Sequence, residues 1–118
     1  MLLKMKNKIN ILSDNKEIQC DIYLATTFIE RLKGLMFSVN EYGLFFENCN
    51  SVHTCFMKFN LDIIGFDKNL KIVQIYSNIK PFKFIMPAKD VKHILEIPSS
   101  FNTQGSFQSG MFVKIEKI

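Results

Sequence analysis

The sequence predicts a mainly β protein, folded as a single compact β-sandwich or squat barrel with one short helix near residues 27–34. Three observations support this fold class. Several short runs alternate between apolar and polar residues, which is the period of a half-buried strand. Clusters of Asn, Asp, Gly, Ser and Pro separate these runs. Only one stretch carries a helix-capping pattern, so the expected strands outnumber the expected helix.

Length and composition indicate a globular protein. The chain has 118 residues, enough for a single core, and we assign residues 1–118 to one domain. Hydrophobic residues make up 47% and charged residues 22%, which excludes a disordered chain. The net charge is +4, but the lysines are scattered and Arg31 is the only arginine. A solvated basic surface is therefore favoured over nucleic-acid binding.

The sequence carries no targeting signal that we can identify. Its N-terminal residues lack the apolar core of a signal peptide, and no apolar run approaches the length of a membrane span. The three cysteines are an odd and sparse set, which is typical of reduced thiols rather than a disulfide framework. We therefore expect a cytoplasmic protein without a membrane span.

The first part of the chain predicts a hairpin followed by the short helix. Residues 4–12 alternate loosely and end at a Ser-Asp-Asn turn cluster, and residues 18–24 then place apolar side chains on one face. Thr27 and Glu30 have the spacing of a capping box, and Gly34 can end the helix in the left-handed conformation. Because so short a helix is unstable alone, it must pack on the sheet.

The rest of the chain predicts a series of strands and one long loop. The expected strands cover residues 43–46, 52–57, 63–66, 70–76, 93–97 and 111–115. Asp67-Lys68-Asn69 lies between two of them and predicts a second hairpin. Residues 77–92 contain two prolines and predict a long loop, either without regular structure or with irregular strand pieces. Loops of this length are often functional or mobile.

Motifs along the chain resemble the domain of unknown function 192 family. They are Ala25-x-Thr27-x-x-x-Arg31-x-x-Gly34-Leu35-Met36, Gly43-Leu44-Phe45-Phe46, His53-Thr54-x-Phe56-Met57-x-Phe59-x-Leu61-Asp62-x-x-x-Phe66-Asp67, Pro81-Phe82-Lys83, Leu95-Glu96-x-Pro98 and Gly110. The resemblance implies a compact β-rich domain, similar to a jelly-roll-like sandwich, and it implies no reaction. Asn60, Ser100 and Met111 depart from the family's pattern, which has proline, glycine and aspartate there.

Five polar residues form a candidate polar site. Asp62 and Glu96 lie among aliphatic residues of expected strands, where a carboxylate must either be paired or point outward. Arg31 can bind a carboxylate in bidentate fashion. In one interpretation, Arg31 forms an ion pair with one of these acids, Asp62 being favoured, and so holds the helix against the sheet as a staple. In the other, Arg31 and the two acids line a polar pocket. A pocket that also held His53 and its neighbour Thr54 could perform acid–base chemistry.

Cysteines near His53 introduce a metal alternative. Cys49, His53 and Cys55 would share one face of a regular strand, but a structural zinc needs four ligands. Cysteines that behave as small buried apolar residues are the favoured interpretation, so we predict no metal and no cofactor. A thiol nucleophile at Cys55 is not favoured either, because no orienting carboxylate is adjacent in the sequence.

An apolar stretch inside the long loop is a candidate binding loop. Phe82, Phe84 and Met86 are either exposed to a ligand or partner, or folded over an open end of the β structure. The first function hypothesis is therefore a non-catalytic binding or accessory module for a small molecule or protein. Its surface would combine this loop with the strand of His53.

The alternative is a small hydrolase-like enzyme. It would use a polar pocket formed by Asp62, Glu96, His53 and Arg31. The sequence lacks a complete set of nucleophile, base and orienting group, and this favours the binding module.

Overall fold

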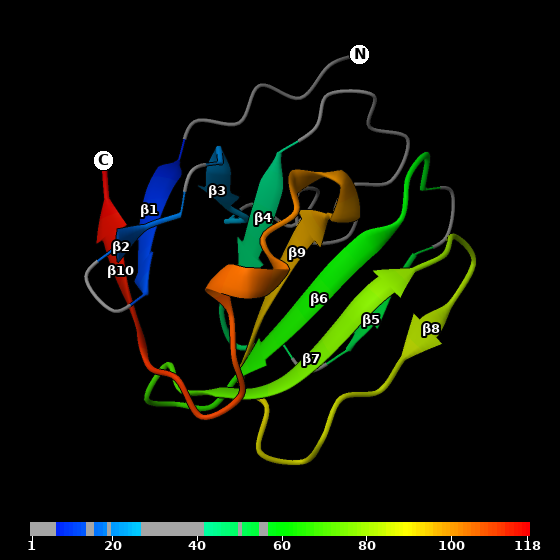
Figure 1. Ribbon diagram of the computed structural model, residues 1–118. Coiled ribbons are helices and arrows are strands. Elements are labelled where there is room, and N and C mark those ends of the chain that lie inside the picture. The colour runs from blue at the N-terminus through cyan, green and yellow to red at the C-terminus, as the bar shows by residue number, and fades with distance from the viewer. Residues whose placement is uncertain (1–6, 14–15, 19, 27–41, 50, 55–56) are drawn as a thin grey trace.

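The computed structural model describes residues 7–13, 16–18, 20–26, 42–49, 51–54 and 57–118 (Figure 1). In chain order the strands are β1 (Lys8–Ser13), β2 (Lys16–Glu17), β3 (Ile22–Leu24), β4 (Gly43–Phe46), β5 (Val52–His53), β6 (Leu61–Phe66), β7 (Ile72–Ile79), β8 (Phe84–Ile85), β9 (His93–Pro98) and β10 (Val113–Lys117). Two 3-10 turns, η1 (Ser99–Phe101) and η2 (Gln104–Ser106), precede β10. The mainly β fold class is confirmed, and the helix expected over residues 27–34 lies outside the described residues. The described part of the chain contains no helix that is long and apolar enough to cross a membrane.

Most of the strands belong to one curled sheet. Its order is β10-β1-β3-β4-β9-β6-β7, with β2 paired to β1, and β5 and β8 form a separate two-stranded sheet. Lys71, just before β7, bridges Phe112, just before β10. The backbone N–H of Val113 also donates to the carbonyl of Leu70 at 3.0 Å. The outer strands of the sheet therefore meet at one end, and the architecture is a squat barrel rather than two separate layers.

The second hairpin forms at the expected turn. β6 and β7 are antiparallel, and the Asp67 carboxylate accepts hydrogen bonds from the backbone N–H groups of Asn69 and Lys71 at 2.8 and 3.0 Å. A short acidic side chain that bonds to the backbone following it is a common turn device. β7 continues to Ile79, further than the sequence predicts, and β8 lies within the stretch expected to be an irregular loop.

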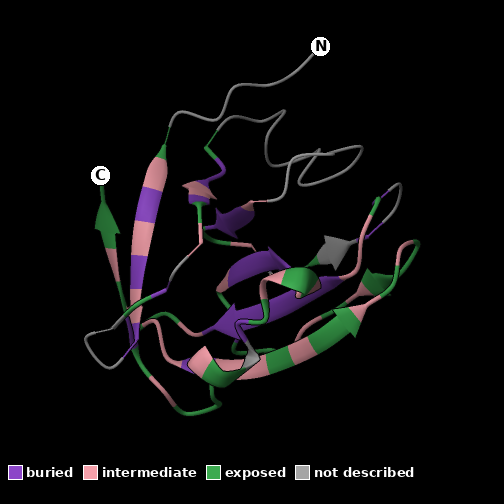
Figure 2. Cartoon of the chain, turned by 45° about the horizontal axis from the view of Figure 1, so that its top comes forward, coloured by how far each residue is buried: buried purple, intermediate pink, exposed green. Residues whose placement is uncertain are grey.

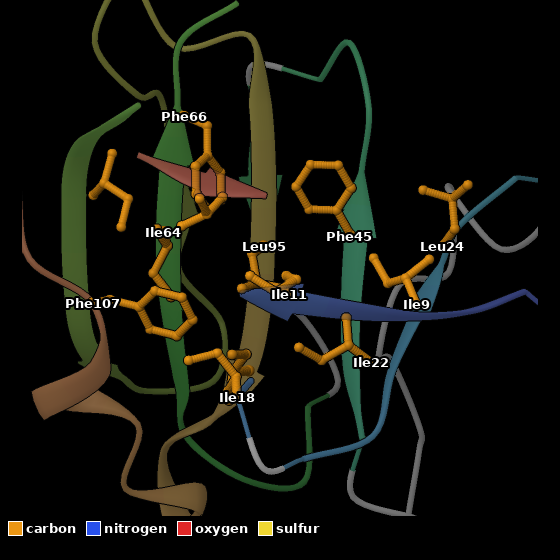
Figure 3. Close-up of a cluster of buried hydrophobic side chains, with 13 residues drawn as sticks. Ile9, Ile11, Ile18, Ile22, Leu24, Phe45, Ile64, Phe66, Leu95 and Phe107 are labelled. Atoms are coloured by element: carbon orange, nitrogen blue, oxygen red, sulfur yellow. The ribbon is translucent and has the colours of Figure 1, made fainter. Parts of the chain in front are cut away.

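Aliphatic and aromatic side chains fill the barrel interior (Figure 3). The rings of Phe45 and Phe66 lie edge to face with centroids 5.8 Å apart. The inner cluster consists of Ile9, Ile11, Ile18, Ile22, Leu24, Phe45, Ile64, Phe66, Ile72, Leu95, Ile97, Phe107 and Val113.

A second cluster covers the outer face of the central strands. It consists of Ala25, Leu44, Phe46, Met57, Leu61, Ile63, Val91 and Ile94. Because successive residues of a strand point to opposite faces, a central strand with both faces covered is buried throughout. All six residues of β6 are buried, whereas β7 is partly exposed along its length (Figure 2).

Candidate functional site

Thr54 anchors the loop that follows β7. Its buried hydroxyl donates a hydrogen bond to the carbonyl of Lys80 at 2.7 Å and accepts one from the N–H of Lys83 at 2.8 Å. Its backbone N–H donates to the Lys83 carbonyl at 2.8 Å, and its carbonyl accepts from the N–H of Phe82 at 2.9 Å. Phe82 has a φ of 65°, a left-handed conformation that a large side chain rarely adopts. The hydrogen bonds of Thr54 thus hold a bent backbone in place.

The side chains beyond this anchor are displayed to solvent. Phe82, Phe84 and Met86 are exposed by 67, 68 and 69%, whereas Ile85 between them packs against the outer core cluster. This alternation is that of a strand with one buried and one open face. The three side chains are not folded over an open end of the barrel. The exposure that a binding loop requires is present, and its binding role stays a prediction.

β8 is also open at its backbone edge. It pairs with β5 through Val52↔Ile85 and His53↔Phe84. The backbone N–H of Thr54 donates to the carbonyl of Lys83, so these two residues form a hydrogen-bonded pair. Because hydrogen-bonded and non-hydrogen-bonded pairs alternate along an antiparallel ladder, the next pair, His53 with Phe84, is a non-hydrogen-bonded one. The N–H and carbonyl of Phe84 therefore point away from β5, where none of the described strands pairs with β8. The backbone of His53 lies opposite Phe84, and its side chain is outside the described part.

Asp62 is buried on the inner face of β6 at an irregularity in the sheet. Two residues of β7, Ser77 and Asn78, oppose this single residue, which is a β-bulge. Asn78 has a φ of 58°, and its N–H donates to Asp62 Oδ1 at 2.8 Å. The hydroxyl of Ser99 donates to the same oxygen at 2.8 Å. The backbone N–H at the bulge and the hydroxyl of Ser99 thus replace hydrogen bonds to water that the carboxylate of Asp62 loses when it is buried.

Glu96 is buried on the other face of the sheet. Its register partners are Leu44 and Ile63, which both belong to the outer cluster. Asp62 pairs instead with Ile97 of the inner cluster. Burial raises the pKa of the Glu96 carboxyl to about 8. Because the two acids point to opposite faces, the described structure does not bring Asp62 and Glu96 into the single pocket that the hydrolase-like alternative requires.

The other sequence-predicted groups fall partly outside the described residues. Arg31 and Thr27 lie there, so the staple between Arg31 and Asp62 and the helix cap stay predictions. Cys55 also lies outside the described residues, so a metal site formed by Cys49, His53 and Cys55 is not tested. Among the residues that the structure describes, no three His, Cys, Asp or Glu side chains gather around a point that could hold a metal ion.

Two polar residues of interest have no signal in the sequence. His93 begins β9, where its Nδ1 accepts a hydrogen bond from the N–H of Asn48 at 3.1 Å and its ring stacks on Phe45. Thr103 lies between the two 3-10 turns, in a connection that appears only as a polar stretch in the sequence. The partners of His93 are distant along the chain, and Thr103 lies beside residues of β6 and β7, so no local pattern could have identified either residue.

Comparisons with known proteins agree with this fold. The chain is 36% identical over 89 residues to UPF0127 protein PF1050 of Pyrococcus furiosus, covering 70% of this chain and 76% of that one. It is 32% identical over 92 residues to UPF0127 protein PH1112 of Pyrococcus horikoshii, covering 73% and 79%. A crystal structure of a protein of unknown function from Novosphingobium aromaticivorans is similar with a TM-score of 0.75 and 21% identity, covering 93% of this chain and 86% of that one. The model of the DUF192 family, described as an uncharacterized ACR, matches residues 9–115. The chain belongs to the DUF192 family.

Proposed function

We propose that this chain is a non-catalytic binding module that contacts a protein partner through its β8 surface, defined as strand β8 together with Phe82, Phe84 and Met86. The observation that carries the proposal is that three large apolar side chains are exposed beside an open strand edge. Exposed apolar patches of this kind mark interaction sites. An open edge can accept an extended segment of another chain as an added strand.

The charge around the β8 surface defines the chemistry of the partner. Lys80 and Lys83 are exposed there, and the sequence has no acidic residue from Asn78 to Lys89. Complementary charge steers association and favours the correct partner. We therefore propose an extended protein segment in which apolar side chains alternate with acidic ones.

Cytoplasmic location and action as one domain over residues 1–118, without a cofactor, belong to the same proposal. The small number of cysteines supports a reducing compartment. Fractionation of cells that produce the tagged chain tests the location, and recovery in a membrane or secreted fraction would contradict it.

Selection of peptides from a random displayed library against the folded chain tests the function. The selected peptides should alternate apolar and acidic residues and should protect the Phe84 amide from hydrogen exchange. Phe84→Ala should weaken their binding about tenfold or more, because the ring lies at the centre of the β8 surface. Phe84→Pro should weaken it further, since proline lacks the outward N–H but leaves the hydrogen bonds to β5 intact.

Phe112→Ala is the matched control. Phe112 is exposed by 59%, and it lies just before β10, outside the β8 surface. Binding to this variant should equal binding to the parent chain. Selected peptides that bind Phe84→Ala as tightly as the parent would overturn the proposal.

A further inference from the structure

The bulge at Asp62 borders a cavity that the β8 surface does not involve. The cavity has a volume of about 30 Å³ and is lined by Asp62, Ile64, Ile75, Ser77, Thr103 and Phe107. It lies between β6, β7 and the connection that contains the two 3-10 turns. Phe107 lies beside Ile64 in the barrel interior (Figure 3). Ile75 and Ser77 of β7 are exposed, so the cavity opens to solvent on that side.

The polar groups that line the cavity retain unused hydrogen-bonding capacity. Asp62 Oδ1 accepts two hydrogen bonds, while no described residue donates to Oδ2. The hydroxyl of Thr103 is buried and has no hydrogen-bond partner among the described residues. Ser77 contributes a second hydroxyl at the mouth. A buried hydroxyl without a partner costs free energy, which a suitable ligand can recover.

The charge in the cavity is also uncompensated by the described residues. Both donors to Asp62 are neutral, and the ion pair within the described part of the chain joins Lys8 of β1 to Asp21, just before β3, at 2.9 Å. A buried carboxylate is stabilised most by a cation that also donates hydrogen bonds. The volume exceeds the roughly 10–15 Å³ that a cavity needs to hold one water molecule, so a small head group can enter.

We propose that the cavity is a binding site for a primary ammonium group. Such a group carries three N–H donors and one positive charge, which match Asp62 Oδ2 and the hydroxyls of Thr103 and Ser77. The exposed Ile75 at the mouth provides an apolar surface for the alkyl stem that follows the ammonium head. The inference is independent of the β8 surface, because none of the residues that line the cavity belongs to that surface.

Titration of the folded chain with methylammonium chloride, followed by amide NMR at constant ionic strength, tests the proposal. Saturable shifts should occur at the amides of Asn78 and Thr103. Asp62→Asn and Thr103→Val should each weaken binding about tenfold or more, because each removes a charged or polar contact. Thr103→Ser should retain it, and Ser109→Ala, an exposed residue outside the cavity lining, should leave it unchanged.

Matched ligands separate charge from size. Tetramethylammonium has the same charge without N–H donors and should not bind, and methanol has a hydroxyl without charge and should bind far more weakly. Shifts that do not saturate, or that are equal for methanol and methylammonium, would show that an ordered water alone fills the cavity and would overturn the proposal. If Asp62→Asn does not fold, Thr103→Val and Ser77→Ala decide the outcome.

Discussion

Asp62 and Glu96 lie one register step apart on neighbouring strands, yet their side chains enter different apolar clusters on opposite faces of the same sheet. Each carboxyl is therefore stabilised in its own way. Asp62 accepts two short hydrogen bonds, whereas Glu96 has no hydrogen-bond partner among the described residues and its pKa is raised by burial. Removing either group should consequently have a different effect on stability.

Asp62→Ala should lower the free energy of unfolding by about 3 kcal/mol, because it strands the N–H of Asn78 and the hydroxyl of Ser99. Asp62→Asn should cost less, since an amide oxygen can still accept both bonds. Urea denaturation measures both effects. A double-mutant cycle combines Asp62→Ala with Ser99→Ala. If the losses in free energy of unfolding of the two single variants add up in the double variant, the hydrogen bond between the two side chains is contradicted.

Glu96 should make stability fall as pH rises. Its pKa in the folded chain is about 8, above the ordinary value of 4.5, so the unfolded chain loses the proton first. Between these two values the free energy of unfolding should decrease by about 1.4 kcal/mol per pH unit, and it should change no further on this account above pH 8. Urea denaturation across this range should show the slope in the parent chain and its loss in Glu96→Gln. Identical slopes in the two proteins would contradict the burial of an unpaired carboxyl.

Thr54→Val should loosen the loop that carries the β8 surface. The change keeps the shape of the side chain but removes the hydroxyl bonds to Lys80 and Lys83, at a cost of about 2 kcal/mol. Hydrogen exchange at the Lys83 amide should accelerate at the same time. Thr54→Ser keeps the hydroxyl and serves as the control. Equal exchange rates of the Lys83 amide in the two variants would show that the hydroxyl does not anchor the loop.

Gly65→Ala should destabilise the barrel by about 1–3 kcal/mol through overpacking. A Cβ atom at Gly65 would lie 2.9 Å from Cγ2 of Val91, whose branched side chain cannot rotate away freely. Gly105→Ala is the matched control, because a Cβ there meets no atom within 4 Å. Thermal unfolding of both variants measures the difference, and equal midpoints would show that Val91 moves without cost.

Local patterns predicted the strands because apolar and polar residues alternate along a strand that has one buried and one exposed face. Ile9, Ile11, Ile22 and Leu24 illustrate this, since each occupies the interior that their alternation indicates. The same reasoning predicted that Asp62 and Glu96 needed special accommodation among aliphatic neighbours.

The relative placement of these groups could not be predicted in the same way. The faces of Asp62 and Glu96 depend on strand register, and a shift of one residue reverses them. The donors to Asp62 come from a bulge in β7 and from Ser99, which the chain brings together only after the sheet has formed. The placement of Phe84 likewise depends on the pairing of β8 with β5 and on the hydrogen bond from Thr54 to Lys83, which join segments far apart along the chain.

The meeting of Lys71 with Phe112 has a consequence for how the chain acquires its fold during synthesis. β10 is made after β1, the strand along which it pairs. A ribosome-bound chain that ends before Val113 has all the strands from β1 to β9 but cannot close the barrel. Until β10 leaves the exit tunnel, the open edge of β1 is available to other nascent chains, so self-association is most favoured at that stage.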